Sequence, residues 1–225
     1  CVVTMIPLAL TLRRRAPVDS ADTVNGGAAY SAPTMMSPRA LQTVLVLAGI
    51  SCCVAMSMPQ VHIVAYCGDL GYGLARGAEM LSLMLAAGIV SRLLSGLIAD
   101  RIGGVGTLIV GSALQGVALL FYLPFDGLAS LYLVSALFGL AQGGIVPSYA
   151  LIVREYFPVQ GISERIGLVF MATITGMALG GWLSGAIFDL TGSYRAAFLN
   201  GIAWNLLNLS IAFWLFRARL RARAA

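Results

Sequence analysis

The sequence predicts an all-α membrane protein whose main domain contains six transmembrane helices. Hydrophobic residues make up 59% of the 225 residues and charged residues only 10%, a composition unusual for a water-exposed surface. Several apolar runs reach the length of about 20 residues that a helix needs to cross a hydrocarbon core of roughly 30 Å. Because lipid offers the backbone no hydrogen-bond partners, we expect these runs to be helices.

The first residues differ from the main domain. Residues 1–12 are apolar but would cover only about 18 Å as a helix, too little to cross a membrane alone. The cluster Arg13 to Arg15 follows this stretch, whereas a signal peptide carries its positive charges before it. We expect residues 1–12 to be the end of a truncated preceding transmembrane helix. Residues 13–38 are rich in Pro, Gly, Ser and Asp and are predicted to form a cytoplasmic central linker.

The main domain is predicted to cover residues 39–216 and to be followed by a basic cytoplasmic tail, residues 217–225. Short connectors separate its apolar runs, and Arg92 interrupts the run from Met80 to Ala99. The approximate spans are residues 41–67, 78–99, 104–125, 128–153, 166–188 and 196–216.

The distribution of arginine predicts the topology. The chain contains no lysine, so its net charge of +5 comes from arginines, and most of these fall in alternate connectors or in the tail. The opposite connectors hold only Arg76 and Arg195. Cytoplasmic loops are rich in arginine, so both ends of the main domain are expected in the cytoplasm. The expected location is the inner (plasma) membrane of the cell, which the chain would cross several times. The charge is therefore a topology signal and does not indicate nucleic-acid binding.

A short motif occurs twice. Residues 95–103 and 184–192 both read S-G-x-I-x-D-x-x-G. The first copy ends the second predicted span on the inner side, and the second copy ends the fifth span on the outer side. This arrangement predicts a three-plus-three inverted repeat, in which the substrate binds near the membrane midplane where the two repeats meet.

Arg92 is the main candidate for substrate binding. A cation within a span costs about 2.5 to 3.5 kcal/mol on insertion scales, so it normally faces a water-filled cavity or a partner. A guanidinium in such a cavity is suited to a carboxylate. The alternative is a structural arginine that pairs with a helix carbonyl or an acidic group.

Four further residues are candidates for the substrate path. His62 is the only histidine; it would suit proton coupling, but a lone histidine on an apolar helix is often hydrogen-bonded to a neighbouring helix. Gln60, Gln142 and Tyr149 are polar residues within spans that either line a path or join helices.

Charged and glycine residues near the inner face form a candidate conformational motif. Charge pairs across these loops would hold one conformation, whereas solvated, weakly coupled charges are the alternative. The motif comprises Gly96, Asp100, Arg101, Gly103, Arg154 and Glu164.

Two stretches resemble a known family. Residues 96–103, Gly-Leu-Ile-Ala-Asp-Arg-Ile-Gly, resemble the loop signature of the major facilitator superfamily, and residues 90–100 are similar to the eighth helix of monocarboxylate transporters and oxalate/formate antiporters. The resemblance implies half of a major facilitator fold, with an N-terminal six-helix half preceding this sequence. It also implies that Arg92 engages a substrate carboxylate. Gly88 stands where some proton-coupled members have an aspartate, which disfavours proton symport.

The leading functional hypothesis is secondary active transport of a small, monocarboxylate-like organic anion by alternating access, coupled to a proton or a counter-anion. The alternatives are a non-transporting receptor or assembly protein on the same fold, and a facilitator of a non-anionic solute. An intramembrane enzyme is disfavoured, because one histidine and scattered acids supply neither a metal site nor a pair of facing carboxylates. No cofactor or metal is predicted.

Overall fold

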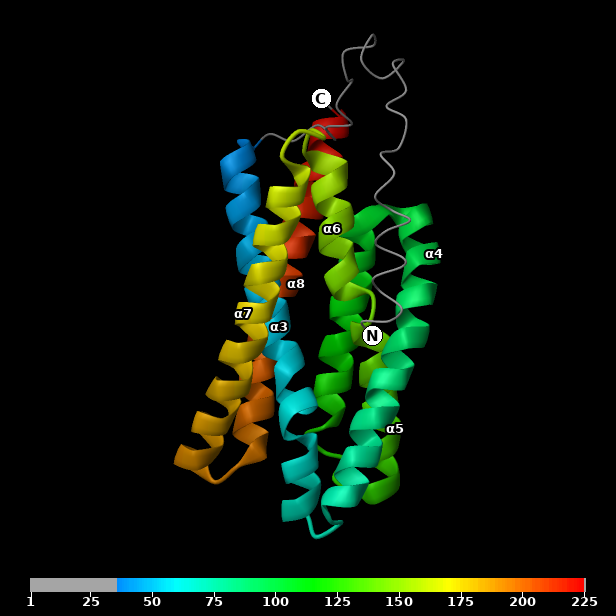
Figure 1. The fold of residues 1–225 in the computed structure, drawn as a ribbon, viewed down its shortest axis with the longest axis vertical. Coiled ribbons are helices and arrows are strands. Elements are labelled where there is room, and N and C mark those ends of the chain that lie inside the picture. Colours follow the sequence, from blue (N-terminus) through cyan, green and yellow to red (C-terminus); the bar gives the residue numbers. More distant parts are fainter. Residues whose placement is uncertain (1–35, 225) are drawn as a thin grey trace, which may run out of the picture. The chain divides into compact units, whose positions relative to one another are not determined.

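The computed structural model describes residues 36–224, and side chains as far as residue 221. Residues 1–12, predicted as a truncated helix, lie outside this range, as does nearly all of the predicted linker, residues 13–38. The described part contains six helical elements and no strand (Figure 1). They are α3 (Pro38–Asp69), α4 (Leu74–Phe121), α5 (Leu128–Gln142), α6 (Ile145–Tyr156), α7 (Ile162–Thr191) and α8 (Tyr194–Ala224).

Local sequence signals explain where α3 begins and α7 ends. The hydroxyl of Ser37 accepts a hydrogen bond from the Ala40 N–H at 3.3 Å, and Pro38 occupies the first helical position, where its missing N–H costs nothing. At the end of α7, Gly192 adopts φ 64° and donates its N–H to the Phe188 carbonyl at 2.7 Å. Such a left-handed glycine is a common helix stop.

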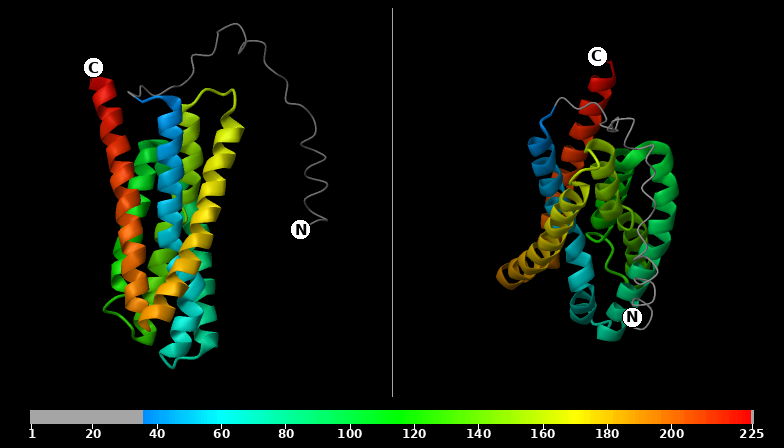
Figure 2. Two further views of the ribbon diagram at one scale, coloured as in Figure 1. Left: turned by 90° about the vertical axis from the view of Figure 1, so that its left-hand side faces the viewer. Right: turned by 45° about the horizontal axis from the view of Figure 1, so that its top comes forward.

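The α4 element is a pair of antiparallel helices. A straight helix of its 48 residues would be about 72 Å long, more than twice the hydrocarbon thickness. Gly103 breaks it with φ 78° and ψ 172°, and the chain folds back there (Figures 1 and 2). The predicted spans 78–99 and 104–125 are therefore two passes within one element. The fold-back requires a residue that tolerates positive φ, which glycine does.

Five segments of the described chain are long and apolar enough to cross a membrane, and α5 with α6 counts as one of them. With the two passes of α4 this makes six, as predicted. The prediction differs at the edges: the span predicted over residues 128–153 divides at Gly143 and Gly144, and the last helix continues through the predicted basic tail to residue 224.

The two copies of the repeated motif end in equivalent ways. Gly103 and Gly192 are the last residues of their copies, and both have positive φ. The fold-back of α4 lies at the end of the bundle where α3 begins and α8 finishes, whereas the turn between α7 and α8 lies at the opposite end (Figure 1). Equivalent turns at opposite ends are what an inverted repeat requires.

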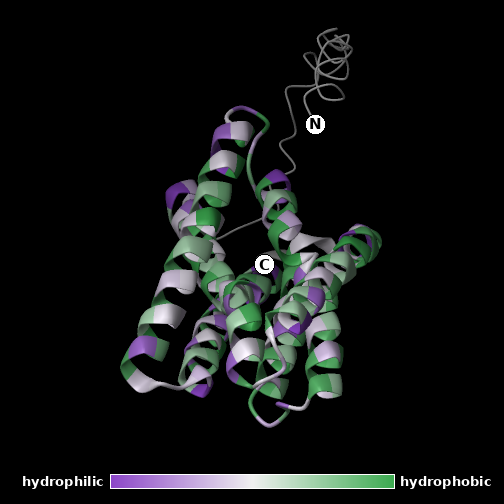
Figure 3. Cartoon of the chain, turned by 60° about the horizontal axis from the view of Figure 1, so that its bottom comes forward, coloured by the Kyte–Doolittle hydropathy of each residue, from purple (hydrophilic) through white to green (hydrophobic). Residues whose placement is uncertain are grey.

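Helix α3 lies at the centre of the bundle. It packs against α4, α7 and α8, and 72% of its apolar 18-residue stretch is buried, against 17% for α4. Small residues allow the closest approach: Gly176 and Gly180 of α7 face the α3 backbone near Ile50 and Val54. Hydrophobic residues occur along all the helices (Figure 3), and many large ones are exposed, among them Leu93 at 73%. A bilayer would cover these faces.

Candidate functional site

Arg92 lies in an open groove of about 460 Å³ between α4, α6 and α7. Its side chain is exposed, while its neighbour Ser91 is buried. The groove is lined by Arg92 of α4, by Val146, Pro147, Ala150, Leu151 and Arg154 of α6, and by Phe170 of α7.

Close packing of α4 against α5 and α6 determines which way Arg92 faces. The Ser91 hydroxyl donates to the Leu140 carbonyl at 2.5 Å, and a Cβ at Gly143 would lie 2.6 Å from the Ser91 Cβ. Ser91 is therefore fixed against the neighbouring helix. The next residue in an α-helix is rotated by about 100°, which turns Arg92 away from this contact and into the groove.

The groove carries positive charge without an acidic residue in its lining. Arg92 and Arg154 both contribute to it, and the other lining residues are apolar. The ion pairs recorded between residues 36 and 221 are Arg76 with Glu79 and Arg219 with Glu155, so they involve neither groove arginine. The groove therefore presents two guanidinium groups beside the Phe170 ring, an arrangement that favours an anion with an apolar body.

Two of the other predicted substrate residues are brought together. Gln60 of α3 donates from Nε2 to Oε1 of Gln142 in α5, at 2.6 Å. Gln142 is buried and Gln60 is partly buried. The pair joins two helices, and neither residue is among those that line the Arg92 groove.

His62 and Tyr149 lie elsewhere. His62 Nε2 is 3.0 Å from the Gly181 carbonyl of α7, which is the helix-to-helix hydrogen bond that sequence reasoning kept as its alternative. The Tyr149 hydroxyl donates to Asn208 Oδ1 at 2.8 Å and is fully buried. The structure thus brings neither residue to the groove.

Tyr149 belongs to a buried polar network that the sequence did not reveal. Asn208 donates onward to the Ser112 hydroxyl at 2.7 Å, and Asn205 donates to Gln115 at 3.2 Å. These bonds join α8 to the second pass of α4 and to α6. The sequence signal was the set of polar residues inside apolar spans, but their pairing depends on how the helices pack.

Three segments of the chain meet at Glu155. Its Oε1 accepts the Gly104 N–H at 2.7 Å, and its Oε2 lies 3.7 Å from Arg219 Nη1. One carboxylate thus connects the end of α6 with the fold-back of α4 and with α8. Sequence reasoning assigned neither Glu155 nor Arg219 to the conformational motif. Both are separated in sequence from the glycines that they approach, so no local pattern links them.

The residues predicted for the conformational motif are dispersed. Gly103 adjoins the Glu155 carboxylate, while Arg154 lines the Arg92 groove. Gly96 is exposed and has open space around it, and Asp100 and Arg101 are also exposed.

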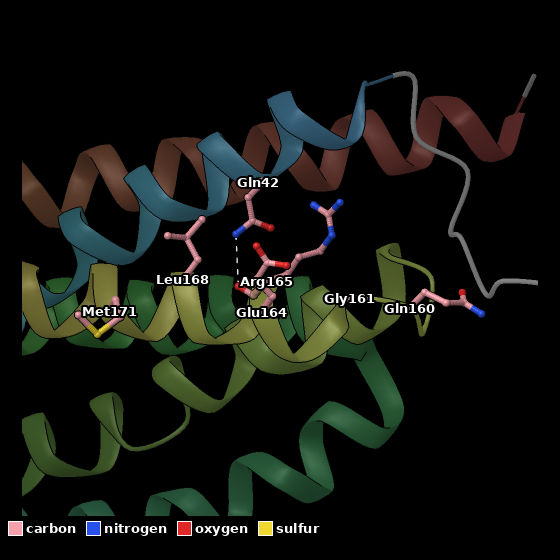
Figure 4. Close-up of a pocket in the computed structure, with 7 residues that line it drawn as sticks. All are labelled: Gln42, Gln160, Gly161, Glu164, Arg165, Leu168 and Met171. Carbon is pink, nitrogen blue, oxygen red and sulfur yellow. Dashed lines mark hydrogen bonds between the residues drawn. The ribbon is translucent and has the colours of Figure 1, made fainter. Parts of the chain in front are cut away.

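Glu164 lines a second pocket, of about 450 Å³, between α3 and α7 (Figure 4). Gln42 Nε2 donates to the Arg165 carbonyl there at 3.3 Å, and the Arg165 guanidinium lies 4.3 Å from the centre of the Phe157 ring. The pocket contains both an acid and a base, so it favours no single sign of charge. It is lined by Gln42, Gln160, Gly161, Glu164, Arg165, Leu168 and Met171.

Comparisons with known proteins agree with this architecture. The family model described as Major Facilitator Superfamily matches residues 40–225. Monocarboxylate transporter 13 of Rattus norvegicus is 31% identical over 144 residues, which cover 63% of this chain and 34% of the relative. Monocarboxylate transporter 12-B of Danio rerio is 27% identical and covers 84% of this chain and 44% of the relative. The chain therefore spans between a third and a half of the length of these relatives.

A solved structure has the same fold. The crystal structure of the peptide transporter POT in complex with alafosfalin matches with a TM-score of 0.70 at 19% identity, over 80% of this chain and 39% of the other. This likeness confirms the predicted fold class, an all-α half of a major facilitator fold.

Proposed function

Because the chain belongs to the Major Facilitator Superfamily, we propose that it forms part of a secondary active transporter that carries a small organic anion by alternating access. The observation that carries the proposal is the Arg92 groove, in which two arginines lie without an acidic lining residue. The names of the rat and zebrafish relatives, both monocarboxylate transporters, agree with a carboxylate as the recognised group.

The position of Arg92 supports a site inside the membrane. It lies eleven residues before the fold-back at Gly103, which corresponds to about 16 Å of helix. A guanidinium at that depth costs several kcal/mol unless water or an anion reaches it, and an open groove allows both. The planar donor fork then binds a carboxylate through two parallel hydrogen bonds, while Phe170 contacts the apolar part of the substrate.

Arg154 gives the groove a second positive charge nearer the inner face. It lies seven residues after Pro147 on α6, about 10 Å further along the helix, and both residues line the groove. In the proposed topology, with the C-terminus in the cytoplasm of the plasma membrane, Arg154 attracts the anion at the cytoplasmic mouth. A gradient of a coupled proton or a counter-anion would drive the transport.

Uptake measurements with substituted protein test the proposal. The complete transporter that contains this chain would be purified and reconstituted in proteoliposomes. Uptake of radiolabelled L-lactate, benzoate and malonate would then be measured. For at least one of these anions we expect Arg92→Ala to lower kcat/KM by about 10- to 100-fold, the loss that follows from removing a charge-assisted hydrogen bond, and Arg92→Lys to lower it less. Arg195→Ala, an exposed arginine at the opposite end of the bundle, serves as the matched control. Unchanged uptake of every transported anion in Arg92→Ala contradicts the proposal.

A further inference from the structure

A second groove, of about 350 Å³, runs between α3 and α8 on the outside of the bundle. The two helices lie side by side (Figure 2), and both Leu47 and Trp214 are about half exposed in it, at 51% and 50%. Its lining is almost entirely apolar. The residues that line it are Val44 and Leu47 of α3 and Ser210, Ile211 and Trp214 of α8.

Exposed arginines lie beyond one end of this groove. Arg217 and Arg221 follow Trp214 on α8 by three and seven residues, so they continue the face that carries Ser210 and Trp214. Arg39 lies eight residues before Leu47 on α3, at the same end of the bundle, because α3 begins where α8 finishes (Figure 1).

These arginines are available to a ligand. The Arg217 guanidinium lies 4.6 Å from the centre of the Phe213 ring, which holds it on the outward side of α8. No ion pair is recorded for Arg39, Arg217 or Arg221 with any residue between 36 and 221. Arg219 contrasts with them, because it points inward to Glu155. The outward arginines therefore lie beyond the end of an apolar groove, without an acidic partner among residues 36–221.

We propose that an anionic phospholipid binds in this groove, with an acyl chain along Leu47 and Trp214 and its phosphate held by Arg217, Arg221 and Arg39. The apolar lining matches a hydrocarbon chain, and guanidinium groups bind phosphate oxygens in a bidentate manner. Arg217 and Arg221 lie one to two turns beyond Trp214, so binding of the phosphate by these arginines places Trp214 near the level of the lipid headgroups. Tryptophan is enriched at that level in membrane proteins. The proposal does not depend on the transported substrate.

Fluorescence quenching tests the proposal directly. These 225 residues contain three tryptophans, so Trp182→Phe combined with Trp204→Phe, and with Phe in place of any tryptophan outside these residues, leaves Trp214 as the reporter. This protein would be reconstituted with phosphatidylglycerol or phosphatidylcholine whose acyl chains are brominated, each diluted in unlabelled phosphatidylcholine. We expect phosphatidylglycerol to quench Trp214 at a mole fraction at least about 25-fold lower, which is about fivefold for each of Arg217 and Arg221. Replacing Arg217 and Arg221 with Gln should reduce this preference by roughly fivefold per arginine.

The matched control is Arg195→Gln, an exposed arginine at the other end of α8, which should leave the preference unchanged. Equal quenching by the two lipids overturns the proposal, and so does a preference that is undiminished in the double variant, in which only Arg39 of the three arginines remains. If neither lipid quenches Trp214, protein covers the groove, which overturns the proposal as well.

Discussion

Adding one methyl group at Gly180 should loosen the contact between α3 and α7. A Cβ there would lie 2.5 Å from the Val54 carbonyl oxygen and 2.6 Å from the Val54 Cα, and it would also collide with the Ser57 hydroxyl. Ordinary contacts are about 3.5 to 4 Å, and backbone atoms cannot rotate away, so the helices must separate by roughly 1 Å. Overpacking of this kind costs about 1 to 3 kcal/mol, whereas Gly→Ala gains about 1 kcal/mol in helix propensity. We expect Gly180→Ala to destabilise the protein by about 1 kcal/mol net.

Gly167→Ala provides the control on the same helix. No atom lies within 4 Å of a Cβ at Gly167, so only the gain in helix propensity applies. Thermal unfolding in detergent, followed by tryptophan fluorescence, should show a Tm lowered by about 2–4 °C for Gly180→Ala and a Tm that is unchanged or raised for Gly167→Ala. The reasoning fails if Gly180→Ala is as stable as the control, because the two helices would then not be in the close contact described.

Two further substitutions test the polar contacts between helices. Glu155→Ala should lower the free energy of unfolding by about 2 kcal/mol, because Arg219 loses its acidic partner and the Gly104 N–H of α4 loses its acceptor. In the same thermal assay, the Tm of Glu155→Gln should lie between that of Glu155→Ala and that of the unsubstituted protein. A null effect of Glu155→Ala would show that the three segments are not joined through this carboxylate. Tyr149→Phe should cost about 1 kcal/mol by leaving Asn208 without its buried donor, whereas Tyr72→Phe, which removes an exposed hydrogen bond, should change Tm little. Equal shifts for these two phenylalanine variants would contradict the buried network.

Hydropathy was sufficient to predict the helical architecture. Length and composition identify a bilayer-spanning run without reference to any other part of the chain, so all six passes were found. The repeated motif also predicted where two turns occur, since Gly103 and Gly192 both end their helices with positive φ. Helix ends were less accurate: the arginine-rich segment that was predicted as a tail is helical to residue 224, because alternating Ala, Leu and Arg favour a helix in water as well.

The site was only partly predictable. Arg92 stood out because an isolated cation in an apolar run has a large energetic cost wherever the helix packs, and the structure places it in an open groove. Neutral polar residues carry no such signal. Each of the three forms a hydrogen bond to a residue of another helix: Gln60 to Gln142, His62 to Gly181 and Tyr149 to Asn208. These partners depend on how the helices rotate and cross, which the local sequence around each residue does not specify.

The most direct test of the central claim is whether water reaches residue 92 within the membrane. Arg92→Cys and Leu93→Cys would be compared in protein whose native cysteines are replaced by alanine, using a charged, membrane-impermeant methanethiosulfonate reagent. Leu93 is 73% exposed on the outside of the bundle, so lipid should shield a cysteine there. The Arg92 groove predicts rapid labelling at position 92 and slow labelling at position 93. A cysteine at position 92 that reacts as slowly as one at position 93 would contradict the groove as a path for anions.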